Sequence, residues 1–382
     1  MVARPALTRK SLRGFTFLRG ICALATVLVC AGGPEAFSAE AWEAEWNRTL
    51  ALAKKEGTVS LALGGSATRE TRPVWEAFQK KFGIRVLISG GSGSKVTSRI
   101  LAERTAGRTE VDLVSIGVAS TIRVLIPNKI AAPMDPLLFL PEVTDRSKWF
   151  GGKHWYGDPD EKYLMLYSLA PDDSGIAINT NLVNEDDLKS YWDIFDPRYD
   201  GKRVSGLMTL AQGANTVGDM MMLVGPEWIT RWVRSKPIFL GETEVAINYL
   251  IEGRAAIGMF LSGELQTLDG LREKGAPVKR ITRAMKEGRS ARGSGVVAIT
   301  NPPHPNAQKL LVNWFLSREG QLLIQKSNDR YNSPREDIPK DMLARDVLRT
   351  PGEKYALPSQ NPEYSKMVKE GIELVRKLRS AQ

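Results

Sequence analysis

The chain contains very little cysteine and histidine. Its 382 residues include two cysteines, Cys22 and Cys30, and two histidines, His154 and His304. Both cysteines lie near the start, so residues 42–382 contain no thiol and can form no disulfide. Zinc or iron–sulfur sites built on cysteine are therefore excluded from those residues. Two imidazoles at most can serve a metal or a proton-transfer reaction.

Long hydrophobic runs are also scarce. The most apolar stretch, Ile21 to Ala31, is too short to span a bilayer and follows five basic residues. Small residues come next, as Ala36-Phe37-Ser38 and Ala39-Glu40-Ala41. This order predicts a secretory signal peptide over residues 1–41, cleaved from the exported chain. A lipid anchor on Cys30 is the alternative, but the residue before it is bulky.

Neither sign of charge dominates. The chain has 53 Lys and Arg against 43 Asp and Glu, a net charge of +10, and the predicted signal peptide holds five basic and two acidic residues, which leaves +7. The basic residues are spread among carboxylates and form no stripe interleaved with aromatic residues. This pattern disfavours nucleic acid as a partner and is compatible with anionic ligands.

Three strand–loop–helix units follow one another at the front of the exported chain. Apolar runs begin at Thr58, Ile84 and Val111, and helical patterns lie between them. This alternation predicts an α/β fold with a parallel sheet. Each run ends in small residues: Gly64-Gly65-Ser66, Gly90 to Ser94, and Ser115-Ile116-Gly117.

These small residues predict a binding edge. In open α/β sheets, ligands bind at the carboxyl ends of the strands. A Gly/Ser loop that opens a helix directs unpaired backbone N–H groups and the positive end of the helix dipole at one point, which suits an anion. We expect this edge to include Ser66, Ser92, Gly93, Ser94 and Ser115. The alternative is that the loops are ordinary turns between strand and helix.

A second α/β region follows. Strand patterns lie at 175–179, 204–207, 255–260 and 295–300, and a helical pattern lies at 244–253. Another helix opens at Gln212 to Thr216, a second candidate anion pocket that faces the first. Its candidate ligand residues are Gly213, Asn215 and Thr216.

Four segments resemble one known family. They are Leu50 to Gly57, Asp173 to Asn181, Asn301 to Ala307 and Asn313 to Gln321, together with the Gly-Ser-Gly-Ser loop. They resemble the periplasmic solute-binding proteins of ABC transporters, in the ferric-iron or extracellular solute-binding branch. The resemblance implies a type II fold, in which two α/β lobes close on a ligand in the cleft between them. It also implies delivery of the solute to an ABC permease in the inner membrane.

The resemblance leads to a division of the chain. We expect the signal peptide at 1–41, a first lobe at 42–172 and 294–327, and a second lobe at 173–293 and 328–382. We expect a periplasmic monomer without a cofactor.

The iron-binding members of the family carry adjacent tyrosines after the strand that matches 255–260. This chain reads Phe260-Leu261-Ser262-Gly263-Glu264 there, and no Tyr-Tyr pair occurs in it. We therefore predict no metal site and a small, organic anion as the solute, with Ser262, Glu264 and Tyr331 also in contact with it. A ferric site made of Glu264, Tyr331 and an exogenous anion is the alternative.

Catalysis is not expected. No Gly-x-Ser-x-Gly motif follows a strand with a matching acid and histidine later, and His304, between prolines in a turn, is expected at the surface. We predict no catalytic residue, with an exported enzyme or a periplasmic sensor on the same fold as alternatives. Arg292 and Arg335 are candidate anion clamps, although most of the 53 basic side chains must be solvated.

Overall fold

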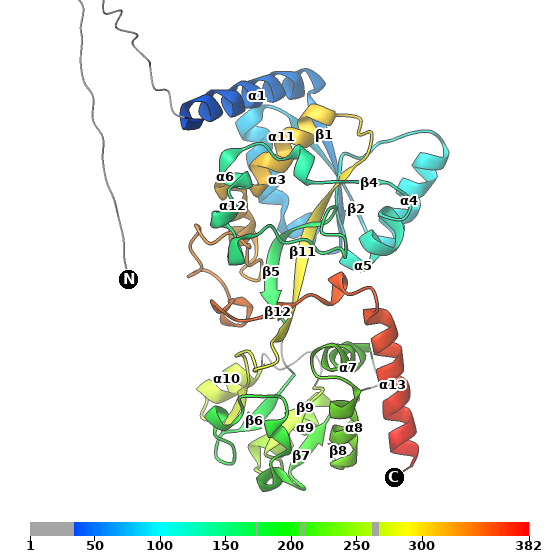
Figure 1. Cartoon of the computed structure of the whole chain (residues 1–382), viewed down its shortest axis with the longest axis vertical. Helices are drawn as coiled ribbons and strands as arrows, with labels where there is room; N and C mark the ends of the chain where they lie inside the picture. Colours follow the sequence, from blue (N-terminus) through cyan, green and yellow to red (C-terminus); the bar gives the residue numbers. More distant parts are fainter. Residues whose placement is uncertain (1–33, 173–174, 207, 209–210, 262–266, 382) are drawn as a thin grey trace, which may run out of the picture. The chain divides into compact units, whose positions relative to one another are not determined.

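The computed structural model describes residues 34–172, 175–206, 208, 211–261 and 267–381. By their contacts, residues 1–41 form one unit and residues 42–382 another. The second unit contains two β-sheets, each with its own helices and apolar core (Figure 1). Among the helices of the described ranges, none is long and apolar enough to cross a membrane.

The first sheet has seven strands. Its main order is β12-β11-β3-β1-β2, with β4 and β5 paired to β11. The strands are β1 (Thr58–Gly64), β2 (Arg85–Gly91), β3 (Leu113–Ser115), β4 (Ala131–Ala132), β5 (Met165–Pro171), β11 (Arg289–Ile299) and β12 (Tyr355–Ala356). The pairs β1–β2 and β1–β3 are parallel, which confirms the repeated units predicted from 58, 84 and 111. The strand predicted at 295–300 is the end of the longer β11, which runs antiparallel to β3, β4 and β5.

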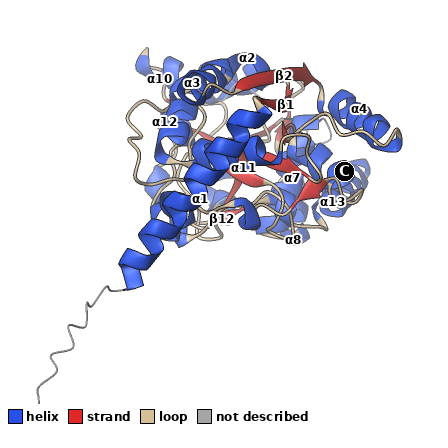
Figure 2. Cartoon of the chain, turned by 90° about the horizontal axis from the view of Figure 1, so that it is seen from above, coloured by secondary structure: helices blue, strands red, loops and turns tan. Residues whose placement is uncertain are grey.

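Helices cover both faces of this sheet. Helices α3 (Arg72–Phe82) and α11 (Pro305–Leu316) lie on one face, and α4 (Gly93–Thr105) and α5 (Val118–Ser120) lie on the other (Figures 1 and 2). Alternate residues of β1 pack into the apolar cores on opposite faces of the sheet. Leu61 and Leu63 pack on the side of α3 and α11, and Ala62 packs on the side of α4. The remaining helices around this sheet are α1 (Pro34–Glu56), α2 (Ala67–Glu70), α6 (Pro141–Thr144) and α12 (Arg318–Ser327).

The second sheet has five short strands in the order β10-β6-β9-β7-β8. They are β6 (Ala177–Asn179), β7 (Arg203–Ser205), β8 (Ile238–Phe239), β9 (Ile257–Met259) and β10 (Val278–Arg280). Its helices are α7 (Ala211–Leu223), α8 (Pro226–Arg234), α9 (Thr243–Ile251), α10 (Thr267–Glu273) and α13 (Tyr364–Ser380). Helix α8 buries Trp228 and Trp232, one turn apart, and their rings stack 5.8 Å apart between centroids.

The end of the chain divides between the two sheets. Tyr331 and Arg335 donate hydrogen bonds to Glu70 and to the carbonyl of Glu142, and Arg349 donates to the carbonyl of Leu169, all beside the first sheet. Helix α13 instead packs on α7 and α8. The placement of 328–382 in the second lobe stays a prediction. In the structure, Tyr331, Arg335 and Arg349 contact elements of the first sheet, and α13 contacts helices of the second.

Candidate functional site

The loops at the carboxyl ends of β1, β2 and β3 lie next to one another. The Gly65 N–H donates to the Gly91 carbonyl at 3.2 Å, which joins the first two loops. A Cβ placed on Gly90 would lie 2.9 Å from Thr68 Oγ1, and one placed on Gly93 would lie 2.5 Å from Ser120 Oγ. The structure thus brings together the three loops that the parallel sheet predicts, at one edge of the first sheet.

Ser92 and Ser94 start helix α4. Ser92 is the N-cap, in extended conformation, and its Oγ accepts a hydrogen bond from the Lys95 N–H at 3.3 Å. The Oγ atoms of Ser92 and Ser94 are 3.1 Å apart, and both residues are exposed. The first turn of this 13-residue helix is therefore open to solvent at a point where the dipole favours an anion. The close neighbour of Gly93 in the structure is the side chain of Ser120.

A carboxylate, Glu70, ends the short helix α2 that Ser66 starts. The pKa of Glu70 lies below its usual value of 4.5, because Ser66, Tyr331 and Asn328 donate hydrogen bonds to it. Tyr331 Oη lies 2.8 Å and Asn328 Nδ2 lies 3.1 Å from Glu70 Oε2. Glu70 is thus an ionised group, and its Oε2 accepts hydrogen bonds from both Tyr331 and Asn328. Its contact with Tyr331 brings the predicted ligand residues Ser66 and Tyr331 into one cluster.

A second tyrosine continues this cluster. Tyr167, on β5, is buried, and its Oη lies 3.2 Å from Ser115 Oγ. Its ring packs edge-on against Tyr331, with 5.9 Å between centroids. Burial raises the pKa of both phenols, so both remain protonated near neutral pH. Sequence reasoning missed Glu70 and Tyr167: Glu70 follows the Gly-Gly-Ser loop and could have been found, whereas Tyr167 sits in an apolar run typical of core.

The second predicted pocket lies at the start of α7. Gly213 is buried, Asn215 is exposed and Thr216 is half-buried. A Cβ on Gly175 would lie 3.4 Å from Thr216 Cγ2, so the first turns of α7 lie beside the segment that leads into β6. The side chain of Tyr364 donates to the Asn215 carbonyl at 3.0 Å, which fixes α13 to α7. The predicted ligand residues Ser262 and Glu264 lie outside the described residues.

Arg292 forms ion pairs with two carboxylates of the protein. Its Nε lies 2.5 Å from Asp172 Oδ2 at the end of β5, and its Nη2 lies 2.8 Å from Asp219 Oδ2 on α7. Tyr364 donates to the other oxygen of Asp219 at 2.8 Å. Burial raises the pKa of Asp219, and the charge of Arg292 opposes that rise. Arg292 therefore ties β11 to α7, and two of its three side-chain nitrogens are used by carboxylates of the protein.

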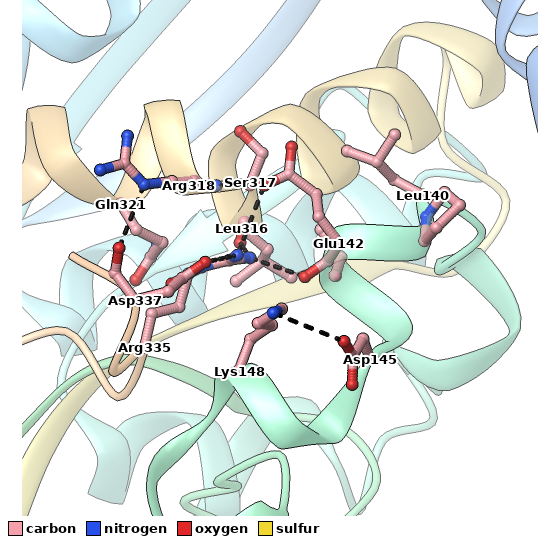
Figure 3. Close-up of polar contacts among 12 residues, drawn as sticks. Leu140, Glu142, Asp145, Lys148, Leu316, Ser317, Arg318, Gln321, Arg335 and Asp337 are labelled. Carbon is pink, nitrogen blue, oxygen red and sulfur yellow. Dashed lines mark hydrogen bonds and ion pairs between the residues drawn. The ribbon is translucent and has the colours of Figure 1, made fainter.

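Arg335 is fully buried, and each nitrogen of its guanidinium donates a hydrogen bond (Figure 3). Its Nε and Nη2 donate to the two carboxylate oxygens of Asp337 at 2.9 and 2.7 Å, and its Nη1 donates to the carbonyls of Glu142 and Leu316 at 2.8 and 3.2 Å. Burial alone would raise the pKa of Asp337, but the hydrogen bonds and charge of Arg335 lower it. The clamp hypothesis for Arg335 is therefore wrong, because its donors are used to hold the chain together.

His304 is half-buried in a polar chain, and is less exposed than expected. Its Nδ1 lies 2.9 Å from Asp112 Oδ2, and its Nε2 lies 2.8 Å from Thr58 Oγ1. The order of hydroxyl, imidazole and carboxylate is that of a hydrolase triad. Here the buried Asp112 also accepts hydrogen bonds from the Ser60 and His304 backbone N–H groups, at 2.7 and 2.8 Å. These bonds fasten the turn before α11 to β1 and β3.

A cavity of about 720 Å³, which we call the charged cavity, lies between α10 with β10 and the chain segment 330–346. Its lining includes five basic and three acidic side chains: Arg272, Lys279, Arg280, Arg330 and Arg345, with Asp269, Glu273 and Asp346. Sequence reasoning missed it, because the two segments that build it are about fifty residues apart and each reads as ordinary solvated surface.

Comparison with models of protein families gives no match for this chain, and comparison with curated proteins gives none either. Comparison with solved structures places the fold in one class, the two-lobe type II fold of periplasmic solute-binding proteins.

Three structures illustrate the likeness. The Bordetella ferric binding protein is 21% identical, with a TM-score of 0.59, and 84% of this chain covers 98% of it. The Trichodesmium protein IdiA (FutA), in complex with iron and citrate, is 19% identical, with a TM-score of 0.58, and 84% of this chain covers 99% of it. An ABC transporter protein from Clostridium perfringens is 12% identical, with a TM-score of 0.58 and the same coverages.

Proposed function

We propose that this chain is the solute-binding component of an ABC importer. In this proposal it works as a monomer in the periplasm, captures a small organic anion between its lobes, and delivers it to the inner-membrane permease. The fold supports a binding role, since it matches almost the whole length of solved binding proteins. The predicted signal peptide supports export.

The observation that carries the anionic solute is the open first turn of α4 at the edge of the first sheet. Backbone N–H groups there lie beside two exposed hydroxyls, Ser92 and Ser94, and next to the loops of β1 and β3. Hydrogen bonds from Ser66, Tyr331 and Asn328 spread the charge of the ionised Glu70 but do not cancel it. The edge therefore offers fixed donors at the start of α4, with one ionised carboxylate beside Ser66.

A ligand screen tests this proposal. Thermal shift followed by calorimetry, across phosphorylated, sulfonated and carboxylated metabolites, should find one anion that binds once per chain. We expect a dissociation constant of about 1 μM or lower, which corresponds to about −8 kcal/mol. A melting point raised only by neutral or cationic ligands would show that the anion assignment is wrong.

A ferric-iron carrier is the second candidate, and the contact between Tyr331 and Glu70 favours it. A phenol and a carboxylate 2.8 Å apart are both hard oxygen donors, and displacement of the shared proton would free both for a ferric ion. Adding ferric citrate and recording the visible spectrum decides between the candidates. A phenolate-to-iron band that disappears in Tyr331→Phe would favour iron, whereas we expect no such band.

A further inference from the structure

The two walls of the charged cavity belong to different parts of the fold. One wall is α10 and β10, on the second sheet, and includes Arg272 and Arg280. The other is the segment that carries Arg330, Arg345 and Asp346, which follows the helices of the first sheet. Neighbouring residues of that segment bond to Glu70 and Glu142 of the first lobe. A molecule in this cavity would therefore contact both lobes.

Two of the three acidic side chains that line the cavity, Asp269 and Asp346, form ion pairs with its arginines, whereas the exposed Glu273 forms none with the described residues. Arg280, 5% exposed, donates to Asp269 at 2.6 Å, and its Nη1 lies 3.6 Å from Asp346 Oδ2. Arg330 Nη2 donates to the same Asp346 oxygen at 2.8 Å. Lys279 pairs with Glu185, which lies outside the lining. Asp346 thus joins an arginine from each wall, and this link holds the walls together without a ligand.

Two other arginines remain available to a ligand. Arg272 and Arg345 are exposed, one on each wall, and within the described ranges no carboxylate forms an ion pair with either. A guanidinium offers planar paired donors that match the oxygens of phosphate or carboxylate groups. A ligand that reached both would need at least two negative groups, and a cavity of about 720 Å³ has room for a small metabolite.

We propose that the charged cavity is a second binding site, separate from the edge of the first sheet, for a multivalent oxyanion such as a diphosphate or a tricarboxylate. Arg272 and Arg345 bind its outer oxygens, and the ion pairs of the buried Arg280 with Asp269 and Asp346 hold the wall behind them in place. Because the anion contacts both walls, it stabilises the arrangement in which they lie close together. The site does not depend on the solute proposed for the edge loops.

Calorimetry with pyrophosphate as the probe tests this site. The full chain should bind one pyrophosphate in the cavity, and Arg272→Gln/Arg345→Gln should weaken that binding at least tenfold without a change in melting point, because both side chains are exposed. Arg108→Gln is the matched control: Arg108 is an exposed arginine on the first lobe, paired with Glu110 at 3.4 Å. It should bind pyrophosphate as the parent does.

Two outcomes would overturn the proposal. One is equal pyrophosphate affinity in the parent and the double variant. The other is an effect that potassium chloride of the same ionic strength reproduces, since a general salt response is not a site. Gly93→Val separates this site from the edge loops. If that variant loses pyrophosphate and the double variant keeps it, the anion binds at the edge and the charged cavity is not its site.

Discussion

The surroundings of Arg335 and the charged cavity contain the same kind of side chain and differ in what that side chain contacts. Arg335 is buried, and Asp337 and two backbone carbonyls accept its hydrogen bonds (Figure 3). Arg272 and Arg345 are exposed, and both face a cavity. The first arginine has its partners within the protein, whereas the other two are open to partners from solution.

This difference shows why basic residues cannot be sorted from sequence alone. From the sequence, Arg335 is a candidate anion clamp, whereas nothing in the sequence singles out Arg272 or Arg345. Yet a buried guanidinium must have its donors satisfied, and the chain supplies acceptors through Asp337 two residues later and through Glu142 and Leu316 far away. The ligand-binding candidates are instead arginines that the chain leaves exposed beside a cavity.

The largest expected effect comes from removing the buried arginine. Arg335→Met should destabilise the fold by about 3–5 kcal/mol, because Asp337 would lose its partner and two carbonyls would lose their donor. Urea unfolding measures it. Arg108→Ala, which breaks an exposed pair, should cost less than about 1 kcal/mol. Similar unfolding midpoints for the two variants would show that the partners of Arg335 do not stabilise the fold.

Gly93→Ala should have a smaller effect, confined to the edge of the first sheet. A Cβ there would lie 2.5 Å from Ser120 Oγ and 3.2 Å from Ser120 Cβ, so the Ser120 hydroxyl must rotate and the loops must shift slightly, at a cost of about 1–3 kcal/mol. Ser120→Gly removes both atoms and should relieve most of that cost, which a double-mutant cycle measures. If the two substitutions are additive, the β2 and β3 loops do not press on each other as the structure shows.

Local patterns were enough to predict much of the first sheet. Strand starts expected at 58, 84 and 111 are found at Thr58, Arg85 and Leu113, because apolar alternation and glycine breaks act over a few residues. The adjacency of their loops then followed from parallel pairing. Contacts between distant segments could not be predicted, since each depends on packing of the whole fold. The bond between Tyr331 and Glu70, 261 residues apart, and the two walls of the charged cavity are examples.

The smallest expected effect is a change of stability with pH that comes from Glu70, the carboxylate beside Ser66 and Tyr331. The arginines of the charged cavity cannot produce such a change. The pKa of Glu70 is lower in the folded chain than its usual 4.5, so its ionised form stabilises the fold above that pH, and the benefit is lost as pH falls through the folded pKa. Glu70→Gln keeps an acceptor for Tyr331 but cannot ionise. The free energy of unfolding of the parent should therefore exceed that of this variant by about 0.5 kcal/mol at pH 7, given solvent screening, and the difference should disappear toward pH 3.

Urea unfolding midpoints from pH 7 to pH 3 measure this difference. Glu76→Gln on α3 is the control, because it also removes an exposed carboxylate. A difference that stays constant with pH would mean that the hydrogen bonds of Glu70, and not its charge, hold the edge cluster together.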